Sequence, residues 1–194
     1  MTRVFSAVDI EDQKLLDRLE DIQDTLDLDF NAVGRQKMHI TLEFFKDIDS
    51  REIRKIKESM DKIELDSFKA DIKGLGVFPS DDYIRVVWAG VEADKFLELY
   101  NQASDHPVES DNNHDFQPHI TLLRVRSPSK EQKKKLKRTI REFKDYEFGK
   151  INVDELKLFE SHIGGKNKYR QIHNKKLRKE DSSIRYRFFY QLLD

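Results

Sequence analysis

The tetrapeptide His-Ile-Thr-Leu occurs twice in the chain, at residues 39–42 and at residues 119–122. If each copy forms a β-strand, successive side chains alternate between faces, so the histidine shares a face with the threonine while isoleucine and leucine face the core. A single copy is most simply a half-buried strand with one hydrogen-bonded histidine. Two matched copies favour a site in which His39 and His119 act together.

Two imidazoles suit a displacement at phosphorus, in which the attacking and leaving oxygens lie in line. One group must take a proton from the nucleophile and another must give one to the leaving oxygen, and imidazole does both near neutral pH without a metal. The hydroxyl groups of Thr41 and Thr121 are short donors for the non-bridging oxygens, where negative charge develops. We therefore expect both histidines and both threonines to surround one phosphate.

The composition limits where such a site draws its charge. The 194 residues suffice for one ordinary folded unit, and 36 lysines and arginines against 37 aspartates and glutamates leave a net charge of -1. An anion site must therefore be local. The absence of cysteine excludes disulfides, thiolate nucleophiles and cysteine-ligated metals. The apolar runs are too short for a signal peptide or a membrane span, so we expect a cytoplasmic protein without membrane contact.

Hydrophobic periodicity predicts strand, helix, strand, helix, strand, and then the same series again. The first series places strands at residues 4–10, 38–45 and 68–78, a helix carrying Leu15 to Leu26, and a helix capped by Asp49 and Glu52. The second places strands at 84–91, 119–125 and 151–159, a helix at 94–103 with Leu97 and Tyr100 inward, and a helix opened by Ser127 and Pro128. Residues 185–193 have the aromatic content of one more strand.

The repeat makes each His-Ile-Thr-Leu segment the middle strand of one half. We predict a single bilobal domain over residues 1–194, with the first lobe centred on 1–80, the second on 81–160, and a basic segment and strand at 161–194. The turn residues 79–82 are the predicted passage between the halves. Two such lobes, each a sheet with helices on its outer side, would set the repeated strands across a cleft.

The two tetrapeptides resemble the paired motifs of the two-histidine phosphoesterase superfamily, and in particular of the LigT-like RNA 2′,3′-cyclic phosphodiesterases. The similarity extends to residues 4–9, 76–79 and 85–91 and covers roughly residues 1–160. The resemblance implies an α+β fold of pseudo-two-fold bilobal form, in which two antiparallel sheets line a central cleft and helices cover the outer faces. It also implies that neither metal nor other cofactor takes part, and we expect a monomer.

The resemblance further implies a reaction. Its substrate is RNA with a terminal 2′,3′-cyclic phosphate, or a small cyclic nucleotide, which is hydrolysed to a 2′-phosphate. His39 would protonate the leaving 3′-oxygen and His119 would activate water, although the pseudo-symmetry leaves the reverse assignment open. Within the same fold, the alternative is cleavage or joining of a 2′-5′ RNA linkage. From a different class, the alternative is a nucleotide-binding module without turnover.

Several residues keep two interpretations. Arg124 matches an arginine common after the second motif and either meets the phosphate or forms a surface ion pair, because alternation points it away from His119 unless the strand bulges. Tyr169 lies in the basic segment 161–179, which is either a surface for stacking on an RNA base or a solvated charged connection. Phe44 to Lys46 and Leu123 replace small residues of the family, which leaves the width of the cleft open.

The remaining histidines are weaker candidates. His106 and His114 share a polar loop, but without helical spacing or a thiol partner they make a poor metal site. His162 and His173 belong to the basic segment and share its two interpretations. The lysines at 133–135 are interpreted as the solvated face of a helix.

Overall fold

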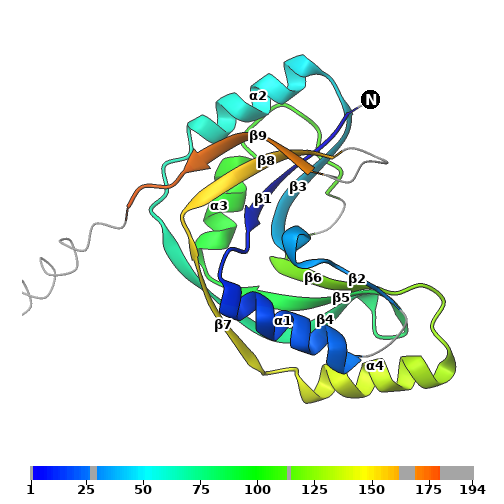
Figure 1. The fold of residues 1–194 in the computed structure, drawn as a ribbon. Coiled ribbons are helices and arrows are strands. Elements are labelled where there is room, and N and C mark those ends of the chain that lie inside the picture. The colour runs from blue at the N-terminus through cyan, green and yellow to red at the C-terminus, as the bar shows by residue number, and fades with distance from the viewer. Residues whose placement is uncertain (1, 27–29, 113–114, 162–168, 180–194) are drawn as a thin grey trace, which may run out of the picture.

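Antiparallel strands form one curled sheet with helices packed against it in the computed structural model (Figure 1), which describes residues 2–26, 30–112, 115–161 and 169–179. The strands are β1 (Thr2–Asp9), β2 (Asn31–Ala32), β3 (His39–Ile48), β4 (Phe68–Ser80), β5 (Tyr83–Glu92), β6 (His119–Arg124), β7 (Glu147–Val153), β8 (Glu155–Ser161) and β9 (Tyr169–Lys176). The helices are α1 (Gln13–Leu26), α2 (Ser50–Asp61), α3 (Lys95–Ala103) and α4 (Lys130–Glu142), with a 3₁₀ turn at Arg35–Lys37. The mixed α and β architecture agrees with the predicted fold class.

The strand order is β7-β4-β5-β6-β3-β1-β8-β9, and β2 pairs with β6. We expected two sheets, but in the described part of the chain β3 and β6 join the two groups of strands into one. The register between them places Ile40 opposite Ile120. The sheet is therefore continuous but narrow at its centre, because these two strands pair briefly and then diverge.

The sheet mixes strands from the two halves of the sequence. β4 comes from the first half but pairs with β5 and β7, and β8 comes from the second half but pairs with β1 and β9. The division near residue 80 is therefore wrong as a boundary in space. Asp81 and Asp82 form the turn of the β4–β5 hairpin, so the chain stays in the same group of strands there.

Three local predictions need correction. The strand expected at 151–159 divides at Asp154 into β7 and β8, because the two pieces pair with strands in opposite groups. Helix α4 begins at Lys130, since Ser129 caps it through a reciprocal capping box with Gln132; the expected start at Ser127 and Pro128 lies earlier. Leu97 is 58% exposed, whereas we expected it to face inward. The strand expected at 185–193 lies outside the described residues.

The predicted N-terminus of α2 is confirmed. The Asp49 side chain accepts hydrogen bonds from the backbone of Arg51 and Glu52, and the Glu52 side chain accepts one from the Asp49 N–H. This capping box satisfies amides that the first helical turn leaves unpaired. None of the helices in the described residues combines the length and the apolar character needed to cross a membrane.

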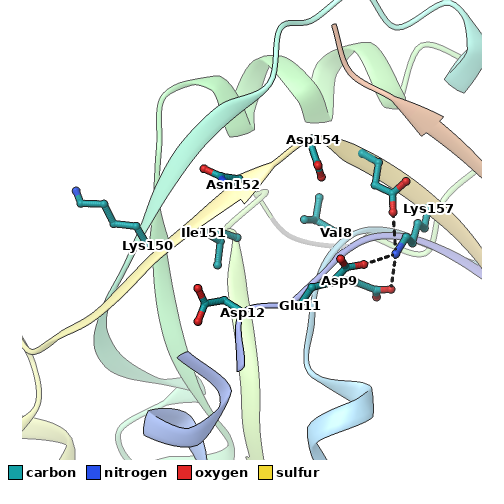
Figure 2. Close-up of a pocket in the computed structure, with 10 residues that line it drawn as sticks. Val8, Asp9, Glu11, Asp12, Lys150, Ile151, Asn152, Asp154 and Lys157 are labelled. Carbon is teal, nitrogen blue, oxygen red and sulfur yellow. Dashed lines mark hydrogen bonds and ion pairs between the residues drawn. The ribbon is translucent and has the colours of Figure 1, made fainter. Parts of the chain in front are cut away.

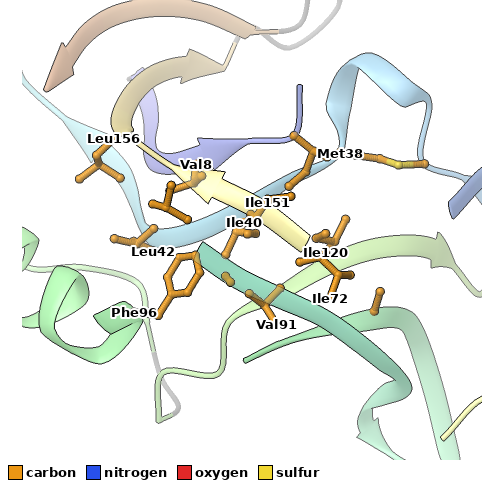
Figure 3. Packing of buried hydrophobic residues seen from close by; sticks show 14 of the residues in the cluster. Val8, Met38, Ile40, Leu42, Ile72, Val91, Phe96, Ile120, Ile151 and Leu156 are labelled. Carbon is orange, nitrogen blue, oxygen red and sulfur yellow. The ribbon is translucent and has the colours of Figure 1, made fainter. Parts of the chain in front are cut away.

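The core positions the strands that carry the repeated motif. Ile40, Leu42 and Ile120 are almost fully buried and pack with Phe96 of α3 among the aliphatic side chains in Figure 3. Burial of this kind stabilises by about 25 cal/mol for each Å² of apolar surface removed from water. Because one face of each motif strand is committed to the core, the histidines and threonines must lie on the opposite face.

Candidate active site

The pairing of Ile40 with Ile120 brings the two motifs together. In an antiparallel pair, the residue before a matched position on one strand stands opposite the residue after it on the other strand, and the two side chains share a face. His39 therefore lies opposite Thr121, and Thr41 opposite His119, around that position. All four side chains are half-buried, as expected for a site that solvent and ligand can enter. Diagonal neighbours in such a pair are about 7–8 Å apart between Cα positions, with closer side chains, so the two imidazoles lie near each other on one face of the sheet.

His39 lies at the first residue of β3 among aromatic rings. The ring of Phe5 stacks on its imidazole, with centroids 5.0 Å apart, and Tyr169 meets it edge-on at 5.8 Å. Burial lowers the pKa of His39 to about 4, although a hydrogen bond with the backbone of Lys37 opposes this effect. His39 is therefore neutral in the free protein at neutral pH.

His119 occupies the matching position on β6. Its Nδ1 lies 2.7 Å from the backbone carbonyl oxygen of Gln117, two residues earlier, and Phe78 meets its ring edge-on at 5.0 Å. Because a carbonyl oxygen only accepts, Nδ1 must carry a hydrogen. In the neutral ring Nε2 is then an acceptor, as a general base requires. Burial lowers the pKa of His119, again against a backbone hydrogen bond.

A β-bulge turns Arg124 toward the histidines. The register between β5 and β6 shifts after Thr121, so Leu122 is the extra residue, and both Leu122 and Leu123 are buried. Two successive buried residues return the next one to the face of the histidines. The positive charge of Arg124 lowers the pKa of both His39 and His119. The bulge on which the direction of the Arg124 side chain depends is therefore present in β6.

The first motif strand bulges at the same place. The register between β1 and β3 shifts after Thr41, and Leu42 and Glu43 are both buried. Phe44 thereby takes the position on β3 that Arg124 takes on β6. It is 46% exposed, and its ring lies 5.6 Å from that of Phe5. From the sequence alone, Phe44 is only a departure from the family pattern; the signal that points to it is its place five residues after the histidine, like that of Arg124.

The other histidines have separate partners. His106 contacts the buried Glu43, and His173 contacts Asp61, so the structure does not bring either to the paired motifs. His114 and His162 lie outside the described residues. Across the ranges that the structure describes, no group of three or more histidine, aspartate or glutamate side chains is arranged to hold a metal ion.

Two histidine-threonine pairs on adjoining antiparallel strands are the arrangement expected of a two-histidine phosphoesterase, and the fold is similar to that of LigT. The chain belongs to the AKAP7 2′5′ RNA ligase-like domain family, whose model matches residues 4–177. This assignment confirms the resemblance predicted from the paired tetrapeptides.

Curated relatives and solved structures agree with this class. An RNA 2′,3′-cyclic phosphodiesterase of Methanothermobacter thermautotrophicus is 36% identical over 169 residues, which cover 83% of this chain and 90% of the relative. One from Methanocaldococcus jannaschii is 27% identical over 162 residues, covering 82% and 91%. TT0787 of Thermus thermophilus has a similar fold, with a TM-score of 0.71, 24% identity and coverage of 92% and 99%. Escherichia coli LigT complexed with 3′-AMP also has a similar fold, with a TM-score of 0.68 and 19% identity. The match covers 92% of this chain and 99% of the LigT chain.

Proposed function

We propose that this protein hydrolyses the 2′,3′-cyclic phosphate at an RNA end, or that of a small cyclic nucleotide, to a 2′-phosphate without a metal. The observation that carries the proposal is the Ile40–Ile120 pairing, which sets both histidines and both threonines around one position. Support also comes from the relatives named RNA 2′,3′-cyclic phosphodiesterase, which this chain matches over most of its length.

In the proposed mechanism His119 is the proton acceptor. Its Nδ1 is held by the Gln117 carbonyl, so Nε2 takes the proton from water as the water attacks phosphorus. His39 is the proton donor to the leaving 3′-oxygen. Its low pKa in the free protein is compatible with this role, because the negative charge of the bound phosphodiester favours the imidazolium form.

The remaining predicted residues bind the substrate. The hydroxyl groups of Thr41 and Thr121 donate to the non-bridging oxygens, whose charge rises in the transition state. Arg124 supplies a positive charge on the same face, which its effect on both histidines supports. Tyr169 lies beside His39 and provides a ring for a nucleoside.

We also propose that the chain is one bilobal, pseudo-two-fold domain with a central cleft. Support comes from matched registers in the two groups of strands. Thr121 lies opposite Trp88, which lies opposite Gly76; Thr41 lies opposite Ala7, which lies opposite Lys157. Each group carries its bulge directly after the threonine. The monomeric state and the cytoplasmic location stay predictions.

The test is turnover of an oligonucleotide with a terminal 2′,3′-cyclic phosphate in the presence of EDTA. His39→Ala and His119→Ala should each lower kcat by about 10²–10⁴-fold, and the double variant should lose little more because the two act as a unit. His173→Ala, in which the lost histidine contacts Asp61 instead, is the matched control and should keep full activity. Turnover retained by the double variant would contradict the proposal.

A second candidate function is action on 2′-5′ RNA linkages, which the description of the matching family model favours. The same four side chains serve this reaction, because it also moves protons on and off ribose oxygens at one phosphorus. Product analysis separates the two activities, since hydrolysis of the cyclic phosphate leaves a 2′-phosphate of unchanged chain length. Tight nucleotide binding with no product of either kind would instead support a binding module.

A further inference from the structure

Asp9 ends β1 directly beside the first catalytic candidate. Its Cα partner on β3 is His39, so the two side chains project to the same face. Opposite residues in an antiparallel pair have Cβ atoms about 4.5–5.5 Å apart, which brings a carboxylate within reach of an imidazole. On the other motif strand the residue opposite His119 is Gly90, which has no side chain. His39 therefore has a carboxylate opposite it on the neighbouring strand, whereas His119 has a glycine there.

The Asp9 carboxylate instead meets Lys157 of β8. The Lys157 Nζ lies 3.1 Å from Asp9 Oδ2, 2.9 Å from Glu11 Oε1 and 2.8 Å from Glu155 Oε1, and its side chain is only 11% exposed. Figure 2 shows these contacts beside a cavity of about 310 Å³. Burial opposes a charged Lys157, but the three carboxylates raise its pKa above the ordinary value. Lys157 is therefore a permanent cation at neutral pH.

Lys157 also has no counterpart in the second group of strands. Lys157 pairs with Ala7, which pairs with Thr41; the matching position opposite Trp88 and Thr121 is Gly76. The lysine and the aspartate thus occur together on the side of His39. A buried lysine with three carboxylates costs desolvation free energy, so its presence where the other group has glycine calls for a role.

The groups that surround His39 indicate what the role of Lys157 is. From β6, Arg124 and His119 act on His39, and both lower its pKa; from β9, Tyr169 packs against it. Asp9 is the acidic residue that the register brings opposite His39. If its carboxylate turned from Lys157 to His39, it would form an ion pair with the imidazolium and add negative charge where the phosphate binds.

We propose that Lys157 is a positioning residue that holds the Asp9 carboxylate away from His39, so that the His39 imidazole stays available to the substrate phosphate. This inference rests on the proposed function for its catalytic consequence. The structural part, which concerns the partner of Asp9 and the ionisation of His39, is measurable without turnover.

The experiment replaces Lys157 by Met and follows His39 by NMR titration together with kcat/KM as a function of pH. In Lys157→Met the pKa of His39 should rise by about one pH unit or more, since a carboxylate now faces it. The KM for the cyclic phosphate should rise about tenfold or more, because binding must displace an ion pair. Adding Asp9→Asn to Lys157→Met should restore both values.

Three further variants serve as controls. Lys157→Arg keeps the cation and should leave the pKa of His39 low. Lys150→Met removes another lysine that lines the same cavity but pairs with Asp71, and should change neither quantity. Asp9→Asn alone should leave the pKa of His39 unchanged, because Lys157 already occupies Asp9; this variant is informative even if Lys157→Met fails to fold.

Two results would overturn the inference. The first is a Lys157→Met protein in which the pKa of His39 does not rise, or in which Asp9→Asn brings no recovery. The second is a fall in the pKa of His39 in Asp9→Asn alone, which would mean that Asp9 already acts on His39. If the wild-type protein had no activity, the proposed function would fail, but the titration of His39 would still decide whether Lys157 holds Asp9.

Discussion

Ile40 and Ile120 stand opposite each other across β3 and β6, and their side chains enter the core from one face of the sheet. This relationship directs the residues before and after them to the other face. His39 and His119 are thus the first residues of two strands that meet at their beginnings. The pairing between β3 and β6 is short, and it places four polar side chains together.

Beyond that pairing, loop residues form hydrogen bonds with backbone groups of β3 and β6. The Asn112 side chain donates to the Leu42 carbonyl oxygen at 2.8 Å and accepts from the Phe44 N–H at 3.2 Å. On the other strand, the Val33 N–H donates to the Leu122 carbonyl oxygen at 2.8 Å. Because these backbone groups are satisfied, β3 and β6 do not need to extend their pairing.

The first prediction concerns the pH dependence of activity. Burial lowers the pKa of His119 and lowers that of His39 to about 4, with Arg124 adding to the effect in both. The state in which His39 and His119 together hold one proton is therefore lost at a lower pH than it would be for two imidazoles with the ordinary pKa. We expect kcat/KM to begin to fall at a pH below 6.5, the ordinary pKa of imidazole, and to fall about tenfold per pH unit above that point.

Arg124→Gln tests the cause of that profile. Removing its positive charge should raise the pKa of both histidines and move the alkaline limb of kcat/KM to higher pH. Arg126→Gln removes an exposed neighbouring charge and should leave the limb in place. A profile that is flat between pH 6 and 9, or one that Arg124→Gln does not move, would contradict the assignment.

The second prediction concerns stability. Between pH 6.5 and about 4 His39 stays neutral in the folded chain but takes up a proton when the chain unfolds. The unfolded state thus binds more protons, so the free energy of unfolding is fully retained above pH 6.5 and falls as the pH drops toward 4, by about 3 kcal/mol. His119 contributes with the same sign.

Urea denaturation at several pH values measures this effect. In His39→Gln the free energy of unfolding should depend less steeply on pH over that window, while His173→Gln, which removes a histidine paired with Asp61, should keep the wild-type dependence. Equal slopes in wild type and His39→Gln would show that the buried imidazole is not the source.

The faces of the two motif strands were predictable because alternation with period two needs only local sequence. The bulges at Leu42 and Leu122 were not, since each breaks the alternation by one residue and the break depends on the neighbouring strand. The sequence Leu122-Leu123 is typical of an ordinary apolar run, and a glutamate such as Glu43 is usually expected to face solvent. Arg124 and Phe44 could be placed only once those bulges were known.

The strand order was also beyond local patterns. Residues 151–159 look continuous, but Asp154 divides them because β7 joins β4 while β8 joins β1. The exchange of strands between the halves depends on long-range pairing, which periodicity does not encode. Asp9 was likewise missed as a neighbour of the site, because its place opposite His39 follows from the register of two strands 30 residues apart.

The third prediction concerns Gly76, which supports His119 indirectly. A Cβ added at Gly76 would lie 2.2 Å from ring atoms of Trp88, and the Trp88 ring centroid is 6.0 Å from that of His119. Gly76→Ala should therefore displace the indole, lower the free energy of unfolding by about 1–3 kcal/mol and lower kcat.

Gly34→Ala provides the comparison for Gly76→Ala. The nearest atom to a Cβ at Gly34 is Gln36 Oε1 at 3.7 Å, an ordinary contact, and its φ of -63° is accessible to alanine. This substitution should leave activity unchanged and should stabilise slightly, because it restricts the unfolded chain. Equal stability and activity in the two alanine variants would show that Trp88 moves aside without cost.

The fourth prediction concerns the buried pair of Glu43 and His106. The side chains are 3% and 2% exposed, and Glu43 Oε2 lies 3.2 Å from His106 Nε2. Burial opposes a charged His106, but the hydrogen bond and charge of Glu43 raise its pKa. His106→Ala leaves the Glu43 carboxylate buried without this partner, which should lower the free energy of unfolding by about 3–5 kcal/mol.

A double variant distinguishes the pair from simple loss of packing. Glu43→Leu with His106→Phe replaces both polar groups by apolar ones, and Leu123 shows that leucine fits the matching bulge position on β6. Its free energy of unfolding should lie well above that of His106→Ala, since no buried charge is left unpaired. Denaturant titrations of wild type, both single variants and the double variant give the coupling free energy. A coupling free energy near zero would mean that groups other than His106 stabilise the buried Glu43 carboxylate. The loop before β6 would then pack on β3 without a contribution from this pair.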